Sequence, residues 1–169
     1  LSLYTHGTLA AKRVIVVGAG GRSDFANPSI RDLAAAVAQT ANKINAASVA
    51  FVLPQLGGNR EALLVQLAVE GLHLGTYKFA RYMTGDDHKK PQSLKSFGIF
   101  TDAKGKKPSA AQARTFQTQA ARGTTIAAAI NHARDLINEP AAVSTPVALA
   151  ADAHAIAKKH KGSVSVTVL

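Results

Sequence analysis

Short apolar runs alternate along this chain with longer segments in which apolar residues recur every three or four positions. Residues 13–18 are rich in β-branched side chains and end in glycine, which is typical of a strand buried on both faces. Residues 27–44 place apolar side chains on one helical face, with Asn27 able to cap the helix and Pro28 in its first turn. Residues 48–53 form a second apolar run. A strand, a helix and a strand in this order predict a right-handed parallel crossover within one sheet.

The same alternation continues through the middle of the chain. Residues 59–83 predict a second helix, capped by Asn59 and carrying leucines along one side. Residues 85–91 are polar and predict a loop, and residues 96–101 form a third apolar run. Three strands separated by two helices predict an α/β fold with helices on the faces of a mostly parallel sheet.

The last third of the chain predicts two more helices and a strand. Residues 109–138 are rich in alanine and predict a long helix that is interrupted at Gly123 and closed by an Asn-Glu-Pro sequence. Residues 145–160 begin with a threonine and a proline, the residue types of a helix cap and a first turn. Residues 163–169 alternate valine with serine and threonine, as a half-exposed strand does. We expect this strand to need cover from further polypeptide.

Composition narrows the class of protein without choosing a function. The chain of 169 residues is 47% hydrophobic and 18% charged, which suits one folded domain, or one domain with part of another. The absence of cysteine excludes disulfides, thiolate metal sites and a cysteine nucleophile within this sequence. No apolar run approaches the roughly 20 residues that a membrane span needs.

The net charge is +10, from 20 basic and 10 acidic residues, so DNA or another polyanion is a candidate partner. Many of the basic residues lie within residues 78–107, among glycine, proline and aspartate. This composition favours a solvated loop over a surface that recognises nucleic acid. A DNA-binding or regulatory module therefore stays as the alternative hypothesis.

The glycines within residues 18–21 follow a predicted strand and precede a predicted helix, so a loop that binds a dinucleotide or ADP-ribose has to be weighed. The full GxGxxG spacing is absent, because Ser23 lies three residues after Gly20, and no acidic residue closes the next strand. A tight turn between strand and helix explains these glycines better. An ADP-ribose-binding module remains a third hypothesis, on fold analogy alone.

No set of residues in this sequence has the spacing of a catalytic or metal site. The histidines have no HExxH register, and a GxSxG serine elbow is absent. Asp86, Asp87 and His88 form the most metal-like cluster, but two lysines and a proline follow them, as in a polar turn. We therefore assign no catalytic, cofactor-binding or metal-binding residue to this chain. The histidines considered are His6, His73, His88, His132, His154 and His160.

Three segments, in order, carry motifs that together span nearly the whole chain. They are residues 12–20 (KRVIVVGAG) with 30–36 (IRDLAAA), residues 68–79 (AVEGLHLGTYKF) and residues 131–146 (NHARDLINEPAAVSTP). The third fits the pattern "N-x-A-R-x-L-x-N-x-P-A-N-x-x-T-P" except at Ala142. In this order, the segments resemble the amino-terminal half of the leucyl (cytosol) aminopeptidase family, which usually has asparagine at that position.

The resemblance implies a macro-like α/β domain over residues 1–108, incomplete at its start because the family domain begins before Leu1. It implies a linker helix over residues 109–140, with residues 141–169 as the first helix and strand of the catalytic domain. Arg134 and Pro140 would fix the linker, and a helix over residues 70–79 would pack on the sheet. The family assembles as a cytoplasmic hexamer of two trimers, so the same assembly and location are expected.

The resemblance also implies that the parent protein is a metal-dependent hydrolase, a metalloprotease that releases amino-terminal residues from peptides with two divalent ions, zinc or manganese. The family binds these ions through "GKG-x-x-F-D-x-GG" and "N-T-D-A-E-G-R", and neither segment is present. We therefore expect these 169 residues to bind no metal and to be inactive alone. Their expected role is in oligomer assembly and in access to the active site, with the catalytic domain of the same protein as partner.

Overall fold

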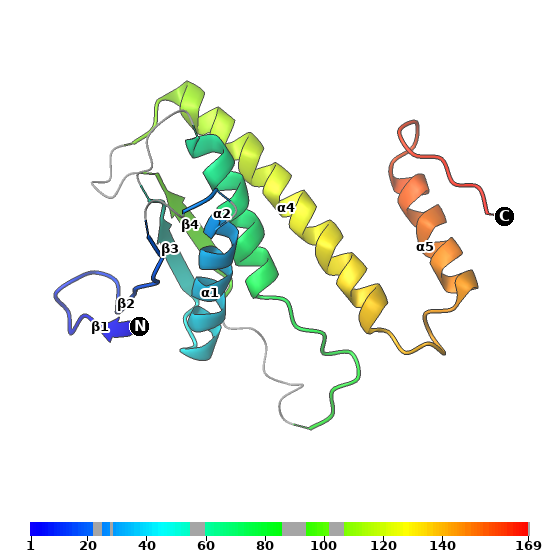
Figure 1. The fold of residues 1–169 in the computed structure, drawn as a ribbon, viewed down its shortest axis with the longest axis horizontal. Coiled ribbons are helices and arrows are strands. Elements are labelled where there is room, and N and C mark those ends of the chain that lie inside the picture. Colours follow the sequence, from blue (N-terminus) through cyan, green and yellow to red (C-terminus); the bar gives the residue numbers. More distant parts are fainter. Residues whose placement is uncertain (22–24, 28, 55–59, 86–93, 102–106, 169) are drawn as a thin grey trace. The chain divides into compact units, whose positions relative to one another are not determined.

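A computed structural model describes residues 1–169 except 22–24, 28, 55–59, 86–93, 102–106 and 169 (Figure 1). The chain divides into two compact units, residues 1–131 and residues 132–169, and each is described by itself. The first unit contains all of the strands in the described part of the chain.

Two parallel strands, β3 (Ser48–Val52) and β4 (Ser96–Phe100), form the sheet of the first unit. In their register Phe51 lies beside Ile99, and both side chains contact the hydrophobic core. The alternate side chains of both strands lie on the opposite face and are exposed. The predicted α/β class is therefore confirmed, with a small parallel sheet.

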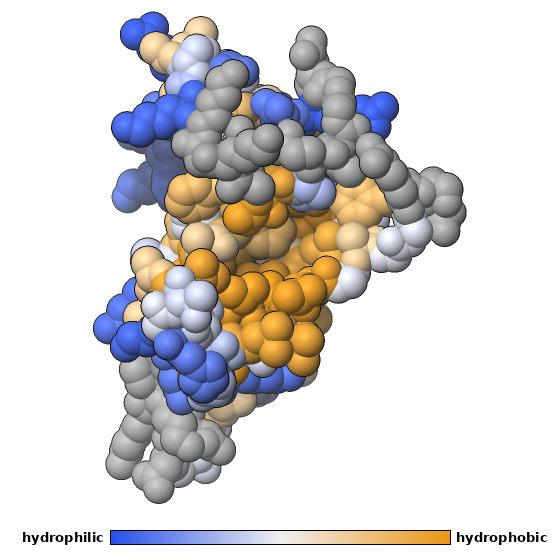
Figure 2. Space-filling model, turned by 90° about the vertical axis from the view of Figure 1, so that its left-hand side faces the viewer, coloured by the Kyte–Doolittle hydropathy of each residue, from blue (hydrophilic) through white to orange (hydrophobic). Residues whose placement is uncertain are grey.

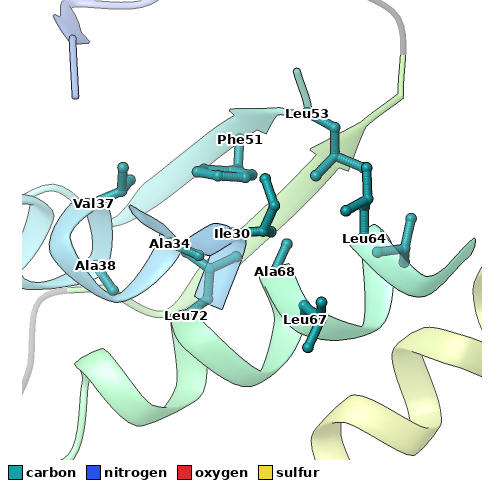
Figure 3. Close-up of a cluster of buried hydrophobic side chains, with 11 residues drawn as sticks. Ile30, Ala34, Val37, Ala38, Phe51, Leu53, Leu64, Leu67, Ala68 and Leu72 are labelled. Atoms are coloured by element: carbon teal, nitrogen blue, oxygen red, sulfur yellow. The ribbon is translucent and has the colours of Figure 1, made fainter. Parts of the chain in front are cut away.

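Helices α1 (Ser29–Lys43) and α2 (Glu61–Gly75) pack together and cover one face of this sheet (Figures 1 and 3). Their apolar residues recur at three- and four-residue intervals, which gives each helix a continuous apolar face. Full burial of a side chain such as Ile30 or Leu72 contributes about 1.5–3 kcal/mol. The core consists of Ile30, Ala34, Val37, Ala38, Phe51, Leu53, Leu64, Val65, Leu67, Ala68 and Leu72.

Helix α2 ends at Gly75, so the predicted end near residue 83 is wrong. Thr76 closes the helix, because its backbone N–H lies toward the carbonyl oxygens of His73 and Leu74 and its hydroxyl donates to His73 O at 2.8 Å. The residue at the amino-terminal cap is Arg60, without a side-chain cap, while the predicted cap Asn59 lies outside the described residues.

The predicted crossover from residues 13–18 to residues 48–53 is wrong within the described part of the chain. β2 (Arg13–Ile15) pairs instead with β1 (Ser2–Tyr4), as an antiparallel sheet separate from β3 and β4. His6 and Gly7 both have positive φ, 48° and 85°, and Thr8 N–H donates to Thr5 O at 2.9 Å. Such a turn reverses the chain and matches the twist of antiparallel strands. The side chains of Ile15 and Val17 still pack against the core, as the apolar run predicts.

Helix α4 (Ala110–Asn138) is unbroken, so the predicted interruption at Gly123 is wrong. Ser109 and Gln112 form a reciprocal cap, since Gln112 N–H donates to Ser109 Oγ and Ser109 N–H donates to Gln112 Oε1. A Cβ on Gly123 would lie 2.6 Å from Gln66 O of α2 and 3.1 Å from Val69 Cβ. The glycine therefore serves the close approach of two helices and is no break.

In the second unit, helix α5 (Pro146–Lys159) starts as predicted. Thr145 Oγ1 accepts a hydrogen bond from Ala148 N–H at 3.2 Å, and Pro146 occupies the first turn. No residue of α5 is buried, and Val147 is 79% exposed. The strand predicted over residues 163–169 is absent among the described residues of that segment, which have no partner strand.

Candidate functional site

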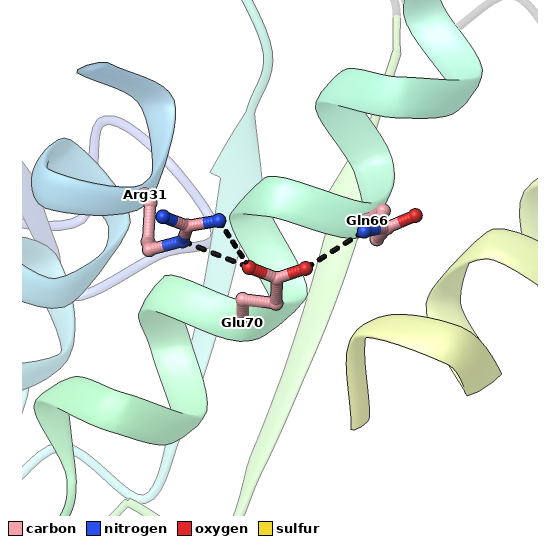
Figure 4. Close-up of polar contacts among 3 residues, drawn as sticks. All are labelled: Arg31, Gln66 and Glu70. Atoms are coloured by element: carbon pink, nitrogen blue, oxygen red, sulfur yellow. Dashed lines mark hydrogen bonds and ion pairs between the residues drawn. The ribbon is translucent and has the colours of Figure 1, made fainter. Parts of the chain in front are cut away.

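A buried polar cluster of the first unit lies between α1 and α2. Glu70 is 1% exposed, and its Oε2 accepts hydrogen bonds from Arg31 Nε at 2.8 Å and Arg31 Nη2 at 2.6 Å (Figure 4). Its Oε1 accepts a hydrogen bond from Gln66 Nε2 at 2.8 Å. Both oxygens are thus engaged, which a buried carboxylate requires. This carboxylate therefore holds two helices together.

Two glycines of α2 bring its backbone against α1 beside this ion pair. A Cβ on Gly71 would overlap the carbonyl oxygen of Arg31 and lie 2.8 Å from Ala34 Cβ. A Cβ on Gly75 would lie 2.5 Å from the carbonyl oxygen of Ala35. Because real Cβ atoms do not tolerate such distances, the two helices can meet this closely only at glycine. Together with Arg31, Glu70 and Gln66, these glycines form what we call the α1–α2 joint.

The motifs quoted above for residues 30–36 and 68–79 meet at this joint. The first supplies Arg31, Ala34 and Ala35, and the second supplies Glu70 and Gly71. Residues 77–79 lie beyond the end of α2, so the expected helix over residues 70–79 is too long. Local spacing does not indicate the ion pair, because its partners are 39 residues apart. The only signal was a single acidic residue within an otherwise apolar stretch of α2.

His73 of α2 lies against two other elements of the first unit, β4 and α4. Its ring contacts the ring of Phe97 in β4, with centroids 5.1 Å apart and nearly perpendicular planes. Its Nε2 lies 3.5 Å from Thr124 Oγ1 in α4. Burial without a charged partner lowers the pKa of His73 below its usual value of 6.5. The ring therefore contributes to packing between α2, β4 and α4.

The other candidate residues are not brought together into a metal site. In the second unit, His132 Nε2 lies 2.8 Å from Asp152 Oδ2, a pair that spacing along the sequence did not indicate. His154 and His160 are exposed in the same unit. Asp86, Asp87 and His88 lie outside the described residues. Among the residues that are described, no group of three or more His, Asp or Glu side chains could hold a metal ion. We assign no metal chemistry to the described residues of this set.

The described backbone of the loop at residues 18–21 is open to its surroundings at Gly18 and Gly20. Gly20 has a φ of 78°, which only glycine adopts readily, and a Cβ on either Gly18 or Gly20 would meet no atom within 4 Å. Ser23 and Asp24 lie outside the described residues. A shallow, open depression elsewhere in the unit is lined by Lys78, Tyr82, Met83 and Thr84. It shares no residue with the glycine loop.

Among the described residues, the side of the β3–β4 sheet opposite α1 and α2 carries exposed apolar side chains. Figure 2 shows hydrophobic side chains gathered over this side of the molecule. Val52 is 49% exposed and Phe100 is 48% exposed, and both belong to the side of the β3–β4 sheet that the helices do not cover. Parallel sheets in folded proteins are usually covered on both faces.

The fold and the α1–α2 joint define the class of protein: an α/β domain in which a buried ion pair holds two helices together. A family model described as the cytosol aminopeptidase family, N-terminal domain, matches residues 1–86, just over half of the chain. The chain belongs to the cytosol aminopeptidase family, and the matched part corresponds to its amino-terminal domain.

Known relatives agree with this membership, and solved structures share the fold. A probable cytosol aminopeptidase of Alkaliphilus oremlandii is 32% identical over an alignment of 169 positions, which covers 98% of this chain and 32% of that protein. The chain thus spans about a third of the length of the curated relatives that it matches. A mutant of tomato leucine aminopeptidase has the same fold, with a TM-score of 0.79 at 24% identity over 100% of this chain and 31% of that one.

A second solved structure with this fold is the bottromycin maturation enzyme BotP in complex with Mn. Its TM-score is 0.71 at 23% identity, over 94% of this chain and 30% of that chain.

In the described part of this chain, no helix is long and apolar enough to cross a membrane.

Proposed function

We propose that the whole protein is a metal-dependent aminopeptidase that releases amino-terminal residues from peptides, and that these 169 residues are its non-catalytic amino-terminal portion. The observation that carries this proposal is the alignment of nearly the full chain with about a third of a probable cytosol aminopeptidase. The α1–α2 joint supports it, because the matched motif residues are used there for packing.

Within this proposal, residues 1–108 form a macro-like domain, residues 109–140 a linker helix, and residues 141–169 the start of the catalytic domain, with α5 as its first helix. Helix α4 supports the second assignment, since it runs from Ala110 to Asn138. Helix α5 supports the third, because it buries no residue within the described chain and its apolar side chains need a partner.

The proposed role of these residues is to stabilise a homohexamer and to shape access to the active site. The apolar, uncovered side of the β3–β4 sheet supports an assembly role, because such a surface is costly to leave in water. The proposed location is the cytoplasm, which the name of the family supports.

Two divalent ions, zinc or manganese, belong to the proposed catalytic part and not to this chain. The manganese named for BotP is a property of that enzyme and supports the choice of metal only by relationship. When bound, a pair of such ions would activate a water and polarise the scissile carbonyl. None of the described side chains is given a part in that step.

Hydrolysis of leucine p-nitroanilide tests the proposal. The full-length protein should be active with manganese or zinc, lose activity with a chelator and contain about two metal ions per chain by elemental analysis. The 169-residue chain alone should bind no metal and release no nitroaniline. Its mass in solution, compared with that of the full-length protein, tests the hexamer. Activity of the short chain, or a metal-free and chelator-resistant full-length enzyme, would overturn the proposal.

A further inference from the structure

Helix α4 runs beside α2 in the first unit and is held there by few side chains (Figure 1). Gly123 and Ala127 are its buried residues, and Phe116 and Ala120 are only partly buried against the core. The core itself contains no residue of α4. Segments with few buried apolar contacts open at a lower cost than the core does. The core can therefore stay folded when α4 moves away from α2.

The contact between α4 and α2 includes a titratable side chain. Gln66 and Val69 of α2 lie against Gly123, and one turn further along α2 the Nε2 atom of His73 lies 3.5 Å from Thr124 Oγ1. These three residues of α2 are spaced three and four positions apart, so they share one face of the helix. Of the three, only His73 changes its charge near neutral pH.

The surroundings of the His73 ring favour its neutral form. The hydroxyl of Thr124 donates to Ala120 O at 3.0 Å, so toward the ring its oxygen can only accept, from a proton on Nε2. The other neighbour of the ring is the apolar ring of Phe97, 5.1 Å away between centroids. A second proton, on Nδ1, would give the ring a charge that neither neighbour compensates. Burying an uncompensated charge is unfavourable, so the packed position of α4 requires the neutral ring.

The charged groups near His73 do not offset a positive ring. Glu70 lies one turn earlier on α2, but both of its oxygens are engaged within the α1–α2 joint. Lys95 directly precedes β4 and adds positive charge. Burial accordingly lowers the pKa of His73 below 6.5. The residues of α4 one turn before and after Thr124 are all alanines, namely Ala120, Ala121, Ala127 and Ala128.

We propose that α4 is a pH-sensitive strap, which protonation of His73 releases from α2 and β4 while α1, α2 and the β3–β4 sheet stay folded. In the closed form the ring has to be neutral, whereas in the open form water solvates the charged ring. Opening therefore becomes more favourable as pH falls below about 6.5, until the pH reaches the lowered pKa of the closed form. A single proton changes the opening equilibrium by up to about tenfold between about pH 7.5 and pH 5.5.

Release of the strap has a structural consequence on each side of the contact. On α2 it uncovers Val69, which is 3% exposed in the closed form and lies against Gly123. On the other side it frees α4, the proposed linker helix, and so loosens the amino-terminal domain from the polypeptide that follows. This second consequence rests on the proposed function, whereas the switch itself requires only the first unit.

Hydrogen–deuterium exchange of the full-length protein, measured by mass spectrometry at about pH 5.5 and pH 7.5, tests the proposal. Each measured rate is divided by the intrinsic exchange rate at the same pH. Peptides from residues 113–128 report on α4, and peptides from residues 30–43 report on α1 as an internal reference. Protection of α4 should fall by up to about tenfold at the lower pH, and protection of α1 should stay the same within about twofold.

Two substitutions of His73 remove the titration in different ways. His73→Phe keeps an aromatic ring against Phe97, and His73→Gln keeps a polar side chain beside Thr124. In both variants the protection of α4 should no longer depend on pH, whatever its absolute value. The matched control is His154→Gln on α5, which removes a histidine outside the first unit and should keep the pH dependence of the parent protein.

Three results would overturn the proposal, and none of them depends on peptidase activity. The first is equal protection of α4 at both pH values in the parent protein. The second is a loss of protection that α1 and α4 share, because the whole unit would then unfold and not the strap alone. The third is a pH dependence that persists in both His73→Phe and His73→Gln.

Discussion

Arg31 of α1 and Glu70 of α2 form an ion pair through one carboxylate oxygen. Glu70 Oε2 accepts hydrogen bonds from Arg31 Nε at 2.8 Å and from Arg31 Nη2 at 2.6 Å. The two partners differ in burial, because Glu70 is 1% exposed whereas the Arg31 side chain is 40% exposed. Without Glu70, the guanidinium of Arg31 could still be solvated. Without Arg31, the carboxylate of Glu70 would stay buried away from water. Removal of Arg31 should therefore cost more stability than removal of the Glu70 charge.

This asymmetry predicts that Arg31→Ala destabilises the protein more than Glu70→Gln. Loss of Arg31 leaves a buried carboxylate with only Gln66 as donor, which should cost about 3–5 kcal/mol. Loss of the Glu70 charge keeps the side-chain shape and leaves a half-exposed arginine, which should cost about 1–2 kcal/mol. Urea unfolding at neutral pH, followed by circular dichroism, measures both values. Arg122→Gln on the open side of α4 should stay within about 0.5 kcal/mol. Equal losses for Arg31→Ala and Glu70→Gln would contradict the asymmetry.

A glycine at the close contact of α1 and α2 should tolerate alanine less well than a glycine on the exposed side of β4. Gly71→Ala places a Cβ against the Arg31 carbonyl oxygen and Ala34, so overpacking of about 1–3 kcal/mol should exceed the gain of alanine in helix propensity, about 1 kcal/mol. Gly98→Ala on β4 meets only Phe100 Cε2, at 3.4 Å, and should change the free energy of unfolding by less than about 1 kcal/mol. The midpoint of urea unfolding distinguishes them. A Gly71→Ala variant as stable as the parent would mean that the helices are not held at this distance.

Helices and strands were predictable from the sequence where apolar periodicity and capping residues determine their bounds. Helix α1 has a regular apolar face, and α5 has a threonine and a proline at its start, so both were found close to their observed bounds. The end of α2 was missed because leucines continue to Leu74 while one hydroxyl, that of Thr76, closes the helix. The pairing of β2 with β1 was missed because the turn between these strands includes a positive φ at His6. Histidine is not a residue type from which a positive φ is predicted.

The joint could be recognised only in part from the sequence. The motifs around Arg31 and Glu70 were found, but the contact between them joins residues 39 positions apart, which no spacing rule reveals. Gly123 was interpreted as a helix break, because intrinsic helix propensity takes no account of packing against neighbouring helices. Its function in the structure comes from α2, whose Gln66 carbonyl occupies the space of a side chain.

The environment of His73 predicts a stability that falls in mild acid. Burial lowers the pKa of His73 below 6.5, so the unfolded chain binds the proton more readily than the folded protein does. The stability associated with the neutral ring is therefore fully present above about pH 6.5 and is lost as pH falls from there toward the lowered pKa. Thermal unfolding measured between about pH 5 and pH 8 should show this loss, and it should be smaller in His73→Gln.

A control separates this effect from other titrations. His154 is exposed on α5, so His154→Gln removes a histidine without changing the contacts of His73 with Phe97 and Thr124. Its stability should depend on pH as that of the parent protein does. If His73→Gln follows the same pH curve as the parent protein, the ring is not the source of the acid sensitivity.

The two faces of the β3–β4 sheet predict different costs for removing a phenylalanine. Phe51 lies in the core under α1, so Phe51→Ala should cost about 3–5 kcal/mol. Phe100 lies on the uncovered face, where Phe100→Ala should cost less than about 1 kcal/mol in the isolated 169-residue chain, as read from urea unfolding. In the full-length protein the second cost should rise above about 2 kcal/mol if further polypeptide or another subunit covers this face, because the ring would then be buried. A cost that stays small in both forms would show that this face remains in water and has no part in assembly.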